Sequence, residues 1–145
     1  LVGPQEKELD PLHPATLAEI ESNPAIEAVD NQADVRPWLA AADCAVLASY
    51  REGFPNVVIE AGAMGLPQIV TDINGANEII IDGQNGPIIT PKDIEELYAA
   101  MHRMISDSDV RRTQAANARA LIASRYEQSY VRRCLYNFYS EILPK

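Results

Sequence analysis

One segment organises the chain: Tyr50-Arg51-Glu52-Gly53-Phe54-Pro55-Asn56-Val57-Val58-Ile59-Glu60-Ala61-Gly62-Ala63-Met64-Gly65. It follows an apolar run, Cys44–Ala48, which is typical of a strand covered on both faces. Pro55 suits the first turn of a helix, where a missing N–H costs nothing. The segment therefore predicts a strand, a turn and a helix in succession, with a glycine that lets a ligand come close to the backbone.

The start of that helix has the features of a site for an anionic ligand. The amides of Asn56, Val57 and Val58 would be free and would point outward at the positive end of the helix, where a phosphate binds readily. Glu52 precedes the turn and Glu60 lies in the helix, with seven residues between them. Two carboxylates repel phosphate, so they suit hydrogen bonds from sugar hydroxyls. The segment thus favours a phosphorylated, hydroxyl-rich ligand such as a sugar nucleotide.

The run from Glu52 to Ala61 resembles the signature of the retaining glycosyltransferases of family 4, which have the two-domain GT-B fold. In that family the motif reads E-x-x-x-x-x-x-x-E and lies in the C-terminal, donor-binding domain. The resemblance implies that the carboxylate of Glu60 accepts hydrogen bonds from the ribose hydroxyls. It also implies that Glu52, the candidate catalytic residue, contacts a hydroxyl of the transferred sugar.

The resemblance assigns donor contacts to the residues between the two glutamates as well. Gly53, Phe54 and Pro55 would contact the donor and also shape the turn, whereas Asn56 and Val57 would act through their backbone amides. Other segments resemble the family in the same order along the chain: Leu1–Gly3, Ala42–Leu47, Gly65–Pro67, Thr71–Asp72, Gly75, Glu78 and Asp82–Gly86. The similarity therefore runs over nearly the whole sequence.

Strands alternate with helices as far as residue 91, and only helical patterns follow. The predicted strands are 26–29, 44–48, 68–71 and 87–89, and the predicted helices of this part are 15–22, 34–42, 56–65 and 77–81. This order predicts a Rossmann-like parallel sheet flanked by helices and ending in an all-helical C-terminal segment. We expect a single nucleotide-sugar-binding domain over 1–145, with an α/β core at 1–91 and helices at 92–145. Such sheets bind ligands at the C-terminal ends of their strands, where the Glu52–Glu60 segment falls.

Parts of the family pattern have no counterpart in this sequence. The family's donor domain begins one strand earlier, with an Arg and a Lys that neutralise the donor diphosphate, and its N-terminal acceptor domain precedes that. We therefore expect this chain to be a piece of a longer protein, inactive alone and a weak binder of donor. Asp30 stands where a small residue is usual near the nucleotide base, which leaves uridine and guanosine donors both open.

Composition excludes several classes of partner. The chain has 145 residues, is 47% hydrophobic and carries a formal net charge of −9, which opposes binding to nucleic acid. Its sequence shows neither a membrane span nor a signal peptide, and its two cysteines cannot form a disulfide scaffold, so a cytoplasmic setting is expected.

His13 and His102 lack the spacing of metal ligands. The resemblance likewise implies a metal-independent enzyme without a cofactor.

The resemblance implies a hexosyltransferase of capsular or cell-surface polysaccharide synthesis. It would move a sugar from a uridine- or guanosine-diphosphate donor to a glycan or lipid-linked acceptor, with the full enzyme peripherally attached to the inner face of the cytoplasmic membrane.

Three alternatives stay open. The first is a GT-B enzyme that acts on the nucleotide sugar alone, such as an epimerase, and the second is a non-catalytic α/β nucleotide-binding module. The third is a phospho-acceptor (receiver-like) domain built around Asp43 and Asp72, although the expected acidic pair and late-strand lysine have no counterpart.

Overall fold

The computed structural model describes residues 1–4 and 11–143, which form two compact units, Leu1–Val35 and Arg36–Lys145. The first unit contains α1 (Pro14–Ser22), one residue longer than predicted. The strand predicted at 26–29 is wrong. Only Val29 pairs, in a single parallel bridge with Val2, through two backbone hydrogen bonds of 3.0 and 2.9 Å.

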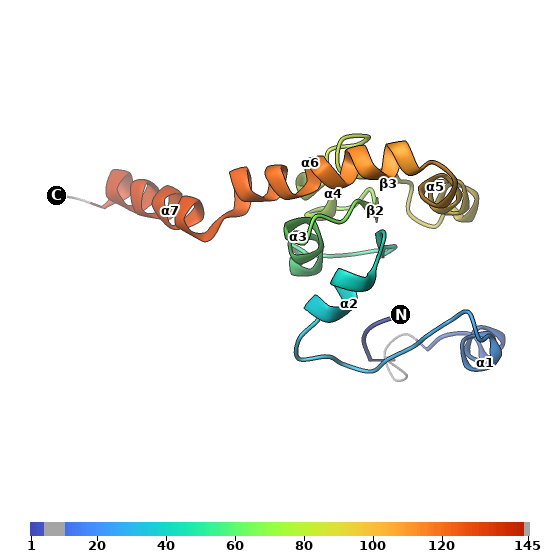
Figure 1. The fold of residues 1–145 in the computed structure, drawn as a ribbon. Coiled ribbons are helices and arrows are strands. Elements are labelled where there is room, and N and C mark those ends of the chain that lie inside the picture. The colour runs from blue at the N-terminus through green and yellow to red at the C-terminus, as the bar shows by residue number, and fades with distance from the viewer. Residues whose placement is uncertain (5–10, 144–145) are drawn as a thin grey trace. The chain divides into compact units, whose positions relative to one another are not determined.

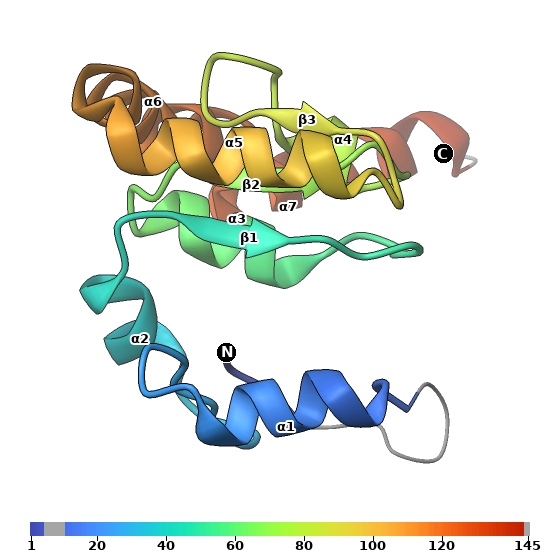
Figure 2. The same cartoon turned by 90° about the vertical axis from the view of Figure 1, so that its right-hand side faces the viewer.

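The second unit holds the sheet and the remaining helices (Figures 1 and 2). Its elements are α2 (Arg36–Ala41), β1 (Ala45–Leu47), α3 (Asn56–Ala63), β2 (Gln68–Thr71), α4 (Ala76–Ile79), β3 (Ile88–Ile89), α5 (Ile94–Ser106), α6 (Ser108–Tyr126) and α7 (Gln128–Ile142). The strands lie in the order β1-β2-β3, and both pairings are parallel. The predicted fold class, a parallel sheet flanked by helices with a helical C-terminal segment, is confirmed.

The central strand β2 is buried along its whole length and separates two apolar clusters. Val70 packs on one side with Val58 of α3 and Ile122 of α6, together with residues of α4. Ile69 packs with Ile89 and Met104 on the side where α5 lies beside β2 and β3 (Figure 2). Because side chains alternate along a strand, β2 stabilises both layers of helices.

Strand β1 corrects one prediction. Residues 44–48 read as a strand covered on both faces, yet Val46 is 45% exposed and only 45–47 are in the strand. In the described sheet β1 is an edge strand, with β2 on one side, so its outward face lacks the helical cover that β2 has.

Two close backbone approaches fix the layers around β2. A Cβ on Gly86 would lie 1.8 Å from the carbonyl oxygen of Gln68, so only glycine fits there. A Cβ on Gly62 would lie 2.5 Å from Cγ1 of Ile122, which shows how closely α3 meets α6. The side chain of Gln68 is 2% exposed and donates to the carbonyl oxygen of Val58 at 2.8 Å, which satisfies a polar group in the core.

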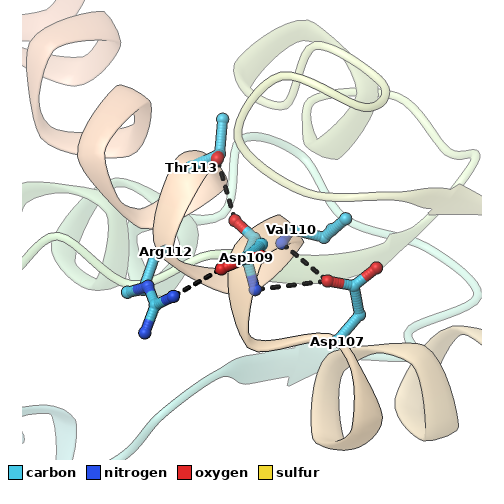
Figure 3. A network of polar contacts seen from close by, with 5 residues as sticks. All are labelled: Asp107, Asp109, Val110, Arg112 and Thr113. Atoms are coloured by element: carbon cyan, nitrogen blue, oxygen red, sulfur yellow. Dashed lines mark hydrogen bonds and ion pairs between the residues drawn. The ribbon is translucent and has the colours of Figure 1, made fainter.

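Single acidic residues separate the last three helices. Asp107 ends α5 and caps α6, where its carboxylate accepts hydrogen bonds from the amides of Asp109 and Val110 (Figure 3). Glu127 caps α7 in the same way, through the amides of Ser129 and Tyr130. These acceptors use helix amides that otherwise lack partners, so the C-terminal segment is three helices rather than one.

Apolar residues recur at helical spacing along α5 and α7, but few of them are buried. Met104 is the only fully buried residue of α5, while Ile94 and Ile105 are each 77% exposed. Along α7 none of the described residues is buried, and Tyr136 is 74% exposed. The apolar residues of α7 therefore form no buried core with the described part of the chain.

Candidate functional site

The turn of residues 52–55, called the signature turn below, leads from the C-terminal end of β1 to the start of α3. It thus lies at the carboxyl edge of the parallel sheet, where α/β proteins bind ligands. Pro55 is the N-cap of α3, one residue before the predicted first turn, with φ −74° and ψ 106°. Proline cannot extend its side chain to an amide, and no side chain of the described residues caps this helix.

The first amides of α3 behave largely as predicted, with one correction. Asn56 and Val57 are the first two helical residues and are exposed, so their N–H groups face outward without an intrahelical acceptor. Val58 was expected to offer a third free amide, and this is wrong. Its N–H donates to the carbonyl oxygen of Pro55 at 3.1 Å, and its side chain is 1% exposed in the core.

The two glutamates of the motif both face solvent to some degree. Glu60 is exposed on the second turn of α3, and Glu52 is partly buried at the start of the signature turn. Across residues 1–4 and 11–143, neither carboxylate takes part in an ion pair or a side-chain hydrogen bond. Their acceptor capacity is therefore available for the hydroxyl groups of a ligand.

The signature turn rests on the backbone of the next turn along the chain. Gly75 has φ +80°, and a Cβ there would lie 2.5 Å from the carbonyl oxygen of Gly53 and 3.0 Å from Cα of Phe54. A positive φ and this close approach both require glycine. The turn at Asn74–Gly75 therefore supports the signature turn through a main-chain contact.

The end of α6 supports the turn from another side. The ring of Tyr126 meets that of Phe54 edge to face, with centroids 5.6 Å apart. The hydroxyl of Tyr126 and Nη2 of Arg125 both donate to the carbonyl oxygen of Glu78, at 3.0 and 2.6 Å. Neither Tyr126 nor Arg125 was predicted as a site residue from the sequence. A tyrosine and an arginine at the last positions of a helix were the available signal.

A shallow pocket lies at the C-terminal ends of all three strands and includes Tyr50 of the β1–α3 loop. Its lining residues are Ala48, Tyr50, Thr71, Ile89, Thr90, Lys92, Asp93, Ile94 and Leu97. The ammonium of Lys92 lies 5.3 Å from the centroid of the Tyr50 ring, a cation–π contact that joins the β3–α5 loop to the β1–α3 loop. Lys92 also has φ +67°.

The residues of the receiver-like alternative do not meet at one site. Asp72 follows β2 and accepts a hydrogen bond from Asn77 at 2.8 Å, whereas Asp43 precedes β1 and lies 4.0 Å from Arg111. Because the strands are parallel, the two carboxylates belong to opposite edges of the sheet. This separation removes the geometric basis for a phospho-acceptor pair.

Two further side chains have distinct environments. Arg111 is partly buried and donates to the carbonyl oxygens of Met104 and Ile105. Cys44 is a packing thiol, and burial raises its pKa to about 11, whereas Cys134 is exposed.

Neither a metal-binding cluster nor a membrane-spanning helix is found in the described part of the chain. Within 1–4 and 11–143, no three His, Cys, Asp or Glu side chains gather as metal ligands would. No helix among these residues is both long and apolar enough to span a membrane.

Known proteins resemble this chain in sequence and in fold. The family model for glycosyl transferases group 1 matches residues 1–107. CapM of Staphylococcus aureus, a capsular polysaccharide biosynthesis glycosyltransferase, is 26% identical over 126 residues, which cover 87% of this chain and 33% of CapM. The chain thus spans about a third of that relative.

Solved structures of other proteins also resemble this chain in fold. HepE of Anabaena, crystallised with UDP-glucose, has 25% identity and a TM-score of 0.80 over 88% of this chain and 35% of its own. A glycosyltransferase of Rickettsia africae has 24% identity and a TM-score of 0.84 over 99% and 39%. The predicted kinship with GT-B glycosyltransferases is confirmed, while the assignment to family 4 stays a prediction. The chain belongs to the family of group 1 glycosyl transferases.

Proposed function

We propose that this chain is the donor-binding part of a retaining glycosyltransferase of bacterial surface-polysaccharide synthesis. The observation that carries the proposal is the start of α3 at the carboxyl edge of the sheet. Among the described residues it has no side-chain cap, and it stands between two carboxylates that have no partner there. Such a helix start attracts a phosphate, and the carboxylates suit the hydroxyls on either side of it. A nucleoside-diphosphate sugar has these groups in this order.

Each residue of the segment has a distinct role in this proposal. The amides of Asn56 and Val57 receive the diphosphate, and Glu60 accepts hydrogen bonds from the ribose. Glu52 accepts a hydrogen bond from a hydroxyl of the sugar to be transferred, and Gly53 and Phe54 form the wall beside it.

The same arrangement would act on the chemical step. As the glycosidic bond breaks, negative charge grows on the leaving diphosphate, and oriented amides stabilise charge that develops in place. We expect this step to require no metal ion or other cofactor. Basic groups of an acceptor-binding domain and of an additional strand would add to this stabilisation and supply the facing wall of the cleft.

The donor is expected to carry uridine or guanosine diphosphate. The likeness to HepE, which was crystallised with UDP-glucose, supports a uridine-linked donor. The likeness to CapM, a capsular polysaccharide biosynthesis glycosyltransferase, supports a role in surface-polysaccharide synthesis. A glycan or lipid-linked acceptor at the cytoplasmic face of the membrane is part of our proposal.

Calorimetric titration with UDP-glucose and GDP-mannose tests the donor site. The wild-type chain should bind one of them, and Glu60→Ala should weaken that binding about tenfold or more, as expected for a lost charged hydrogen-bond acceptor. Glu141→Ala, which changes an exposed glutamate of α7, is the matched control and should leave the affinity unchanged. Folded protein that binds neither ligand would refute the proposal.

The alternatives give different results. A non-catalytic module that binds nucleotides elsewhere would keep its affinity in the Glu60→Ala variant. An epimerase-like enzyme would alter the sugar nucleotide in the absence of acceptor, which product analysis with the whole protein would detect.

A further inference from the structure

We propose that Tyr126, the last residue of α6, is a positioning residue for the signature turn and thereby for binding the sugar and diphosphate of the donor. The inference rests on the proposed function for its ligand but on separate contacts for its geometry. Tyr126 lies in a different helix from the motif and far beyond Glu60 in the sequence, so the motif itself gives no hint of it.

The first contact is made by the ring of Phe54 in the signature turn. The rings of Phe54 and Tyr126 meet at an interplanar angle of 64°, with centroids 5.6 Å apart. Phe54 is 46% exposed, so the covered part of its ring depends on few neighbours. An edge-to-face pair restricts both the position and the tilt of a ring. Tyr126 therefore limits where the turn can place Phe54.

The second contact lies at the end of α4. The carbonyl oxygen of Glu78 belongs to the last turn of that helix, where carbonyls lack intrahelical partners. It accepts hydrogen bonds from the Tyr126 hydroxyl at 3.0 Å and from Arg125 at 2.6 Å. The guanidinium of Arg125 also lies 5.0 Å from the centroid of the Tyr126 ring, which holds the ring in place.

These contacts close into a ring. Gly75 is the N-cap of α4 and touches the backbone of Gly53, while Glu78 near the other end of α4 is held by Tyr126. Tyr126 in turn touches Phe54, which follows Gly53. The turn, α4 and the end of α6 thus fix one another. Losing the Tyr126 side chain opens the ring at two of its contacts and also removes packing against the core cluster that includes Val58 and Ile79.

The hydroxyl is suited to this role at neutral pH. Burial raises the pKa of Tyr126 above its ordinary value, although the charge of Arg125 opposes the shift. The phenol therefore keeps its proton and remains a hydrogen-bond donor to Glu78.

Two variants separate the contacts. Tyr126→Phe keeps the ring and removes the hydrogen bond, whereas Tyr126→Leu removes both. Tyr136→Leu is the matched control, because Tyr136 is 74% exposed on α7. Each variant is titrated with UDP-glucose and with uridine, followed by NMR, and with GDP-mannose and guanosine if the wild-type chain prefers them.

A positioning role affects the two ligands differently. Loss of a preorganised turn should weaken UDP-glucose binding by about tenfold in Tyr126→Leu, and by less in Tyr126→Phe. Uridine has no diphosphate or transferred sugar to meet the signature turn, and its ribose is proposed to contact Glu60 on the second turn of α3, so its affinity should change by less than about twofold. An equal loss for both ligands, or no loss for either, would overturn the inference.

A ligand-free measurement decides the question independently. In Tyr126→Leu the ¹⁵N order parameters of Gly53 and Phe54 should fall, while those of β2 stay at the wild-type values. Unchanged order in the turn would overturn the inference. If the wild-type chain binds no sugar nucleotide, the proposed function fails, and these order parameters alone then decide whether Tyr126 positions the turn.

Discussion

Gly75 lies against the backbone of Gly53, so closely that a Cβ on Gly75 would stand 2.5 Å from the carbonyl oxygen of Gly53. Real Cβ atoms do not approach an oxygen to this distance, and the neighbouring atoms, Cα of Phe54 and Cδ of Pro55, belong to the same rigid turn. The relationship ties the turn after β2 to the turn after β1. Main-chain packing at Gly75 thus helps to set the position of the signature turn, together with the side chain of Tyr126.

Gly75→Ala should therefore damage both stability and donor binding. Its φ of +80° with ψ −50° lies outside the left-handed helical region and costs an alanine about 1–3 kcal/mol, and the clash with Gly53 adds to this. Gly83→Ala is the matched control, because Gly83 has φ +72° and an added methyl group would meet nothing within 4 Å. Urea unfolding should show a clearly larger loss for Gly75→Ala, and equal losses would mean that the contact with Gly53 is unimportant.

Arg111→Met should destabilise the α5–α6 junction without affecting donor binding. Nη1 of Arg111 donates to the carbonyl oxygens of Met104 and Ile105, at 2.5 and 3.3 Å, and these would lose their partner. We expect a fall of about 1 kcal/mol in the free energy of unfolding, because the bond to Met104 is partly buried whereas the carbonyl oxygen of Ile105 is exposed to water.

Arg112→Met is the control for this change. Arg112 pairs with Asp109 at the surface (Figure 3), where both side chains are largely exposed, so its loss should cost less than about 0.5 kcal/mol. If the two variants are equally stable in urea, the hydrogen bonds of Arg111 to Met104 and Ile105 contribute nothing to stability.

Cys44 should resist alkylation. Burial is the main cause that raises its pKa to about 11, so the reactive thiolate is scarce at pH 8. Iodoacetamide should label the exposed Cys134 about tenfold faster or more, as measured by mass spectrometry of peptides. Comparable rates for the two cysteines would show that Cys44 is not buried in solution.

The same shift in the pKa of Cys44 fixes the direction of a pH effect on stability. The folded chain holds this proton more tightly than the unfolded chain, whose thiol titrates near its ordinary value of 9.0. The contribution of Cys44 to stability is therefore complete below pH 9 and is lost as the pH rises toward about 11. Cys44→Ala should remove that part of the pH dependence of the urea midpoint.

Local patterns predicted much of the fold. β2 was predicted at its observed limits, because a short apolar strand between a Gly-Leu-Pro turn and Asp72 has one consistent assignment. The exposure of α7 was not predictable in the same way. Helical periodicity shows which side chains share a face, but only a packing partner decides whether that face is buried.

The candidate site likewise combines residues that the sequence identified with residues that it did not. The residues expected to meet the ligand lie next to one another in sequence, and their motif identified them. Their supports, Gly75 and Tyr126, reach the signature turn from other elements, and such contacts follow from tertiary packing. The free amide expected at Val58 was wrong for a local reason, since its N–H turns back to Pro55 as α3 begins.

The proposed function requires above all that a sugar nucleotide binds at the start of α3. Titrating ¹⁵N-labelled chain with UDP-glucose, and with GDP-mannose in parallel, tests this most directly. We predict the largest shifts at the amides of Gly53, Asn56 and Val57, and their loss in Glu60→Ala. Shifts confined to other elements, or none with either ligand in folded protein, would contradict it.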